Sequence, residues 1–175
     1  ARQSDRSLSV WSAACSTGQE PYSISMLLHE QPELRGWNVE IVGTDVSGLA
    51  IRRAQEATYS KLELQRGLPG DWLARYFEAV GSRWRVREEI RRSVTLRIQH
   101  VLGGGPAVRR YDLILLCNVL MYFDDPTRRE VLTRVHASLL HDGFLILDRA
   151  VASTGIGDEL FESQRYGSFE VHRPR

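Results

Sequence analysis

The sequence predicts a doubly wound α/β fold, in which a mostly parallel sheet has helices on both faces, with a small antiparallel β insertion. Short β-branched or apolar segments alternate with amphipathic helical segments along most of the chain. Two of them, 113–117 and 144–147, are almost continuously apolar, which is typical of parallel strands buried on both faces. The alternation breaks between residues 59 and 99. With 175 residues, the chain has the length of one domain, so we expect a single domain at 1–175 with an insertion at about 59–99.

The first strand and helix are expected near the start of the chain. Residues 8–14 alternate between apolar and polar and then become small, as in a strand that enters a tight turn. Pro21 suits the first turn of a helix that runs to about Glu30, and Pro32 ends it.

A second strand and helix follow. The β-branched segment 39–44 predicts a strand that ends at Asp45. Ser47 is then the expected N-cap of a helix. The residues expected on the buried face of this helix are Leu49, Ile51 and Ala54.

The interrupted region predicts a small β insertion with an arginine-bearing face. Leu73, Tyr76 and Phe77 indicate a short helix. Segments 84–87 and 94–98 alternate apolar with charged residues, the pattern of half-exposed antiparallel strands.

The parallel pattern then resumes. Buried strands are expected at 111–117 and 144–147, and a closing hairpin at 161–173. The helix between the two strands begins at Asp124 or Asp125, with Pro126 in its first turn, and ends near Gly143. Ligands of such folds lie beyond the carboxyl ends of the strands, so the site is expected there.

Composition excludes several classes of protein. Hydrophobic residues make up 42% and charged residues 26%, which is unlike a disordered chain. The longest apolar runs are too short to cross a bilayer. Cys15 and Cys117 without a histidine cluster predict neither a disulfide framework nor a metal site. With no recognisable leader, we expect a cytoplasmic protein without membrane insertion.

The charge is uneven although the net charge is only +1. Residues 83–110 contain eight arginines against two glutamates. This block is either a solvated face or a docking surface for an acidic partner. The near-zero net charge argues against a nucleic-acid partner.

Two features at the strand ends suit a nucleotide-like ligand. The turn at 14–18 has small side chains, so its backbone N–H groups can approach a carboxylate or phosphate, and a helix N-terminus follows. Asp45 ends the next strand, where a carboxylate can accept both hydroxyls of a ribose. The turn lacks the glycine pattern that a pyrophosphate requires, so adenosine joined to an amino acid fits better than a dinucleotide.

Several motifs resemble those of the CheR family, the chemotaxis-receptor glutamate methyltransferases. They are WSAACSTGQEPYS at 11–23, GTDVS at 43–47, RGLP at 66–69, RYF at 75–77, WRV at 84–86, YDLI at 111–114 and NVLMYFD at 118–124. The resemblance covers nearly all of residues 7–143. It implies the seven-stranded, Rossmann-like methyltransferase fold. It also implies that the chain corresponds to the C-terminal S-adenosylmethionine-binding domain, without the N-terminal helical domain of the family.

The resemblance implies S-adenosylmethionine as the cofactor, with S-adenosylhomocysteine as the product. Glu20 would bind near the methionine end of the cofactor, and Asp45 would hold the ribose. His100 and Val101 would lie at the adenine side. The residues expected to bind the cofactor are Ala14, Cys15, Gly18, Glu20, Asp45, Val46, His100, Val101, Asn118 and Val119.

The implied reaction is methyl transfer to glutamate side chains of a chemotaxis-type receptor or related signalling protein. Such a carboxylate is already ionised at neutral pH and needs no general base, so catalysis rests on positioning and electrostatics. Tyr122 is a candidate for the methyl-transfer site. Arg149 is a candidate to orient the substrate carboxylate, because a guanidinium contacts two oxygens at once.

Some residues depart from the family pattern. Cys117 stands where the family usually has arginine, His100 where it has asparagine, and 147–149 replaces a small and acidic strand ending. The turn at 80–83 is short, which resembles family members that do not depend on a C-terminal receptor pentapeptide. Arginines expected to meet acidic receptor helices are Arg85, Arg87, Arg91 and Arg92.

Two other functions stay open at this point. One is a cofactor-binding or scaffold module of the same fold that no longer catalyses, because of these departures. The other is an RNA-directed methyltransferase that uses the arginine block, for which salt-sensitive RNA binding would be the sign.

Overall fold

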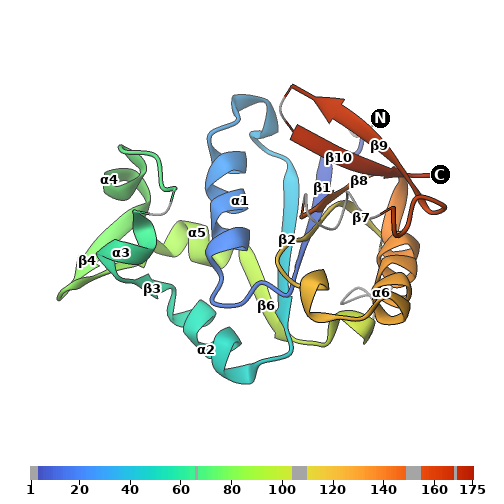
Figure 1. The fold of residues 1–175 in the computed structure, drawn as a ribbon. Coiled ribbons are helices and arrows are strands. Elements are labelled where there is room, and N and C mark those ends of the chain that lie inside the picture. Colours follow the sequence, from blue (N-terminus) through green and yellow to red (C-terminus); the bar gives the residue numbers. More distant parts are fainter. Residues whose placement is uncertain (1–3, 66, 104–109, 149–154, 168) are drawn as a thin grey trace.

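The main element of the fold is a seven-stranded sheet of order β6-β2-β1-β7-β8-β10-β9 (Figure 1). The computed structural model describes residues 4–65, 67–103, 110–148, 155–167 and 169–175. The strands are β1 (Ser7–Ala13), β2 (Asn38–Asp45), β6 (Val94–Ile98), β7 (Tyr111–Leu116), β8 (Leu139–Leu147), β9 (Phe161–Tyr166) and β10 (Phe169–Pro174). The neighbouring strands β6, β2, β1, β7 and β8 pair in parallel, whereas β10 is antiparallel to β8 and β9. The predicted mostly parallel sheet and its closing hairpin are confirmed.

Helices lie on both faces of the sheet, with α1 and α6 on opposite sides (Figure 1). The helices are α1 (Gln19–His29), α2 (Gly48–Glu56), α3 (Lys61–Leu64), α4 (Trp72–Tyr76), α5 (Glu88–Arg92) and α6 (Asp125–Ser138), with 3₁₀ turns η1 (Pro32–Leu34), η2 (Val101–Gly103) and η3 (Leu120–Tyr122). Among the described helices, none is both long and apolar enough to span a membrane.

Strand β1 contributes to the core on both faces because successive side chains of a strand point to opposite sides. Val10 packs in one cluster with Tyr22 of α1, and Trp11 packs in the other with Leu132 of α6. The indole Nε1 of Trp11 donates to the hydroxyl of Thr44 at 2.9 Å, so its polar atom is satisfied within the core. Strand β1 is thereby packed on both faces up to its carboxyl end, where the turn to α1 begins.

The helix after β2 begins as predicted. The hydroxyl of Ser47 accepts a hydrogen bond from the backbone N–H of Ala50 at 3.2 Å. Ile51 and Ala54 are buried, but Leu49 is 54% exposed, so the prediction for that residue is wrong. Ile51 and Ala54 are three residues apart and share a face of the helix, whereas Leu49 is two residues before Ile51 and therefore lies on a different side.

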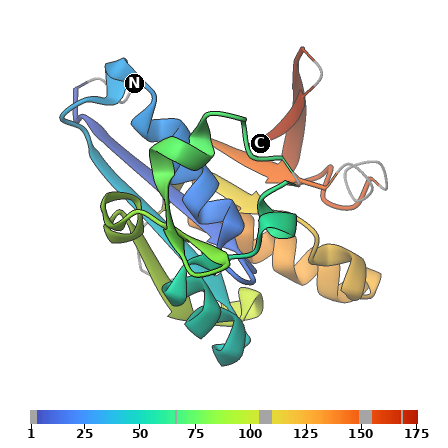
Figure 2. The same cartoon turned by 90° about the vertical axis from the view of Figure 1, so that its left-hand side faces the viewer.

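A small antiparallel sheet of order β3-β5-β4 lies beside α1 (Figure 2). Its strands are β3 (Thr58–Tyr59), β4 (Phe77–Val80) and β5 (Arg83–Val86), and α3 and α4 lie between β3 and β4. The predicted short helix included Phe77, but the helix ends at Tyr76 and Phe77 is the first residue of β4. The prediction that 94–98 is an antiparallel strand of this insertion is also wrong, because β6 pairs in parallel with β2 at the edge of the main sheet. Exposure of that edge produces the alternating pattern that suggested an antiparallel strand.

The helix α6 ends earlier than predicted. Asp124 is its N-cap and accepts from the N–H of Thr127 at 3.0 Å, but the helix ends at Ser138 and not near Gly143. Leu139 is buried and starts β8 opposite Tyr111. Gly143 instead lies inside β8 next to a register irregularity, where a Cβ would come within 3.0 Å of the Asp112 carbonyl oxygen.

This close approach predicts that Gly143→Ala destabilises the chain. The added methyl group meets backbone oxygens that cannot move aside, so we expect the free energy of unfolding to fall by about 2 kcal/mol. The matched control is Gly70→Ala, because a Cβ there would meet nothing within 4 Å. Urea unfolding of both variants measures the difference, and equal stability of the two would contradict this packing.

Candidate functional site

The site lies where the order of the strands reverses. From β1 the chain proceeds to β2 and β6 on one side, and then crosses to β7 and β8 on the other. Such a switch point leaves a crevice at the carboxyl ends of the strands. A cavity of about 490 Å³ lies there, lined from the ends of β1, β2, β6 and β7. It is within the size range of small-molecule sites.

The turn between β1 and α1 forms one wall of the cavity. Ala14 (φ 59°), Ser16 (φ 49°) and Gly18 (φ 90°) all have left-handed backbone conformations. The first two are costly for residues with a side chain and persist only where the surroundings hold them. Part of that restraint is the N–H of Cys15, which donates to the carbonyl of Thr44 at 2.9 Å.

The carboxylate of Asp45 provides further restraint and points its oxygens at two backbone segments. One oxygen accepts from the N–H of Ser16 at 2.9 Å, and the other from the N–H of Ser47 at 2.8 Å. A carboxylate has about four acceptor positions, so each oxygen can accept one further hydrogen bond. Asp45 lines the cavity and offers that capacity to a ligand.

Glu20, in the first turn of α1, is the second carboxylate of the cavity lining. Its Oε1 accepts from the buried hydroxyl of Ser12 at 2.6 Å. Burial raises the pKa of Glu20 above its usual range, the hydrogen bond from Ser12 opposes the rise, and the charge of Asp148 adds to it. The site therefore contains a poorly solvated carboxyl group, whose ionised form a cationic group of a ligand would stabilise.

The two cysteines of the cavity wall stay as thiols. Burial raises the pKa of Cys15 to about 12, with Asp45 and Glu20 adding to the effect. Burial likewise raises the pKa of Cys117 to about 12, with Glu20 and Asp148 adding to it. A protonated thiol is a poor nucleophile, so both cysteines act as small, neutral side chains.

The opposite wall is the segment that follows β7. Asn118 has a left-handed conformation, with φ of 56°, and its backbone N–H donates to the carboxylate of Asp148 at the end of β8. The 3₁₀ turn η3 then places Tyr122 on the rim, where its side chain is 79% exposed. Asp148 thus restrains the loop after β7 by accepting from the backbone N–H of Asn118, as Asp45 restrains the turn after β1 by accepting from that of Ser16.

The structure brings most of the predicted cofactor residues together around this cavity. Those that line it are Ala14, Cys15, Glu20, Asp45, Val46, His100, Val101, Asn118 and Val119. Tyr122 also lines it. Gly18 does not line the cavity. A glycine is needed there for packing, because a Cβ at this position would come within 2.9 Å of the Cβ of Ala54. Arg149 lies outside the described residues.

Sequence reasoning missed other residues of the site. The further residues of the lining are Ser16, Gln19, Gln99, Cys117 and Phe123. Ser16, Gln19 and Phe123 lie within the quoted motifs, and Cys117 had been noted as a departure from the family pattern, but none had been assigned to the cofactor. Gln99 precedes His100. Asp148 gave a weaker signal, since only its place at the end of a predicted strand pointed to it.

The four arginines predicted to dock a substrate lie away from this cavity, on and after β5. Arg85 Nε donates to the hydroxyl of Thr58 at 3.4 Å, and Arg87 donates to the carbonyl of Ala74 at 3.2 Å. Arg92 pairs with Glu88 on the same short helix, and Arg91 is half-buried. Three of these guanidinium groups therefore already have partners within the chain.

The half-buried position of Glu20 gives a prediction for stability against pH. Burial raises its folded-state pKa above the usual 4.5, so the cost of ionising it is absent at low pH and grows as pH rises through the folded-state pKa. We expect the free energy of unfolding of the unmodified chain, relative to Glu20→Gln, to fall between about pH 4 and pH 7. Urea unfolding of the two proteins at pH 4 and at pH 7 measures this relative stability. A relative stability that stays constant, or that rises for the unmodified chain as the pH rises, would contradict the raised pKa of Glu20.

The chain is similar in sequence to chemotaxis methyltransferases. The family model described as CheR methyltransferase, SAM binding domain, matches residues 1–159. Chemotaxis protein methyltransferase 1 of Pseudomonas aeruginosa is 38% identical over 157 residues, which covers 86% of this chain and 57% of that protein. A chemotaxis protein methyltransferase of Vibrio parahaemolyticus is 34% identical over 164 residues, with coverage of 91% and 59%. This chain thus spans little more than half the length of these relatives.

Solved structures share the fold at low identity. The magnesium protoporphyrin IX methyltransferase of Synechocystis, crystallised with SAM, has a TM-score of 0.53 at 16% identity and covers 95% of this chain and 67% of that one. A TehB-like SAM-dependent methyltransferase of Corynebacterium glutamicum has a TM-score of 0.55 at 12% identity, with coverage of 95% and 78%. The fold is thus that of the Rossmann-like SAM methyltransferases, and the extent of the family match shows that this chain belongs to the CheR methyltransferases, as their SAM-binding domain.

Proposed function

We propose that this chain binds S-adenosylmethionine in the strand-end cavity and transfers its methyl group to glutamate carboxylates of a chemotaxis-type receptor. The single observation that carries the proposal is the cavity at the switch point, with Asp45 held at the end of β2. The family membership and the names of the relatives support the substrate. Because the chain spans about half of those relatives, the activity and partner of the whole protein are part of the proposal.

The residues present fit the cofactor at its ribose end. A ribose presents two neighbouring hydroxyl donors, and Asp45 presents two oxygens with acceptor capacity to spare. Its orientation is fixed by the N–H groups of Ser16 and Ser47, so little conformational freedom is lost on binding. His100 and Val101, after β6, would lie at the adenine side.

The methionine end also has suitable partners. The carboxylate of Glu20 can accept from an ammonium group, and its poor solvation strengthens that interaction. Asn118 and Val119 would line the middle of the cofactor, where the cavity wall is backbone held by Asp148. Within the described residues, the lining contains no lysine or arginine, which suits a ligand carrying positive charge.

The chemistry requires positioning more than proton transfer. When bound, the cofactor supplies an activated methyl group. A substrate glutamate has a reference pKa of about 4.3 and is ionised at neutral pH, so no protein group has to remove a proton. Glu20 and Asp45 repel a second carboxylate from the inner cavity, which favours approach from the rim. Tyr122 stands there with an exposed phenol that can donate to the substrate, and we assign Arg149, by its sequence position after Asp148, to the same task.

A second candidate function is a cofactor-binding module that does not catalyse. The observation in its favour is Cys117, a neutral thiol of the cavity wall at a position where the resemblance implies an arginine. Binding of cofactor without transfer of methyl groups would distinguish this function from the first.

Cofactor binding is tested by titrating S-adenosylhomocysteine into the chain in a calorimeter. We expect Asp45→Ala to weaken binding by at least about tenfold, because two charge-assisted hydrogen bonds and the restraint on Ser16 are lost. The matched control is Asp71→Ala, an exposed carboxylate before α4 that lies outside the cavity. Equal affinity of the two variants would contradict the place of the ribose.

Methyl transfer is tested with labelled S-adenosylmethionine and the cytoplasmic fragment of a chemotaxis receptor. Carboxyl methyl esters hydrolyse in mild base, so we expect the label on the receptor to be base-labile and to fall several-fold with Tyr122→Ala. Label that resists base, or that appears on added RNA, would contradict glutamate methylation. Binding without any label would favour the non-catalytic module.

A further inference from the structure

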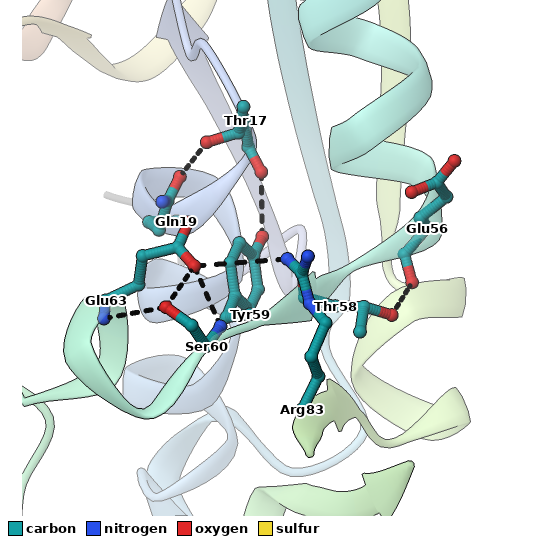
Figure 3. A network of polar contacts seen from close by, with 8 residues as sticks. All are labelled: Thr17, Gln19, Glu56, Thr58, Tyr59, Ser60, Glu63 and Arg83. Carbon is teal, nitrogen blue, oxygen red and sulfur yellow. Dashed lines mark hydrogen bonds and ion pairs between the residues drawn. The ribbon is translucent and has the colours of Figure 1, made fainter. Parts of the chain in front are cut away.

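The turn that forms the wall of the cofactor cavity is held from two different sheets. Two restraints come from the end of β2, through the carbonyl of Thr44 and the carboxylate of Asp45. A third comes from the insertion, because the phenol of Tyr59 in β3 donates to the carbonyl of Thr17 at 2.8 Å (Figure 3). The small sheet therefore contacts the cofactor turn directly.

Tyr59 is built as a fixed donor. Its side chain is only 3% exposed and packs in the core cluster on the α1 face, and its backbone pairs with Trp84 of β5. Burial raises the pKa of Tyr59 above its usual value, so the phenol keeps its proton. A buried phenol with this geometry has one strong acceptor, the Thr17 carbonyl.

Polar contacts fix the strand on both sides of Tyr59 (Figure 3). The carboxylate of Glu63 accepts from the N–H of Ser60 at 2.8 Å, and the hydroxyl of Ser60 accepts from the N–H of Glu63 at 3.3 Å. Arg83 donates to the carbonyl of Thr58 at 2.6 Å and lies 3.9 Å from Glu63. These contacts leave the phenol little freedom to follow the turn if the turn moves.

The contact continues from Thr17 to the cavity. The hydroxyl of Thr17 donates to Oε1 of Gln19 at 2.7 Å, and both Ser16 and Gln19 line the cavity. Thr17 lies between two residues with left-handed backbone conformations, Ser16 and Gly18. Strained conformations of this kind need several restraints at once, and Tyr59 supplies one that comes from the small sheet.

We propose that Tyr59 is a positioning residue of the cofactor site, through which the small antiparallel sheet holds the turn at 14–18 in its binding conformation. The inference rests on the proposed cofactor function of the cavity and extends it to a residue that lies outside the cavity lining. The phenol acts through the turn and does not touch the cofactor.

The test compares Tyr59→Phe with Tyr22→Phe. The matched control removes the same group from the same environment, because Tyr22 is also 3% exposed and its phenol donates to the carbonyl of Ala54 in α2 at 2.9 Å. The two variants should lose similar stability in urea. We expect Tyr59→Phe alone to weaken S-adenosylhomocysteine binding by about 2- to 12-fold, the range for one hydrogen bond of ordinary net strength.

Amide hydrogen exchange of the ligand-free chain supplies a readout that does not depend on the cofactor. We expect the N–H groups of Cys15 and Ser16 to exchange faster in Tyr59→Phe than in Tyr22→Phe, since these N–H groups hold the turn to β2. Unchanged affinity and exchange in Tyr59→Phe, or equal losses in both variants, would overturn the proposal. If the unmodified chain bound no S-adenosylhomocysteine, the proposed function would fail, and exchange alone would decide the role of Tyr59.

Discussion

The hydrogen bonds of the Asp45 carboxylate are the interaction on which the cofactor cavity depends. One oxygen holds the turn after β1 and the other holds the start of α2. Without them, the left-handed Ser16 would lose its N–H partner at a point where the backbone is already strained. The same carboxylate lines the cavity, so the group that holds the site together is also the group that we propose to bind the ribose. Such preorganisation lowers the entropic cost of binding.

The opposite wall repeats this arrangement with Asp148 and the left-handed Asn118. At each of two strand ends, a carboxylate thus accepts from the N–H of a left-handed residue in a loop that lines the cavity. Glu20 adds a third, poorly solvated carboxylate, which we propose to lie at the methionine end of the cofactor. The acidic, thiol-containing lining suits a cation, and a nucleophile that arrives already ionised, as the proposed function has it, needs no base from it. Under the proposed function, catalysis would then come from alignment of the substrate at the rim, near Tyr122.

Much of the fold and the site could be predicted because the signals are local. Residues close together in the sequence determine the buried strands and the helix caps at Ser47 and Asp124. The position of the cavity follows from the rule that such folds bind ligands at the carboxyl ends of their strands. The errors concern long-range pairing. Segment 94–98 has the pattern of an exposed edge strand, and the pattern alone does not tell which sheet has that edge. Gly143 marks a close backbone approach inside β8, which a sequence cannot distinguish from a helix end. The contact from Tyr59 to Thr17 joins residues far apart in the chain and had no sequence signal.

The most direct test of the central claim is a crystal structure of this chain with S-adenosylhomocysteine. The account predicts the ribose hydroxyls against the carboxylate of Asp45, the amino group towards Glu20 and the adenine next to His100 and Val101. It also predicts that the turn at 14–18 keeps its left-handed residues. A ligand bound elsewhere, or a ribose held by other groups while Asp45 contacts only the backbone, would contradict it.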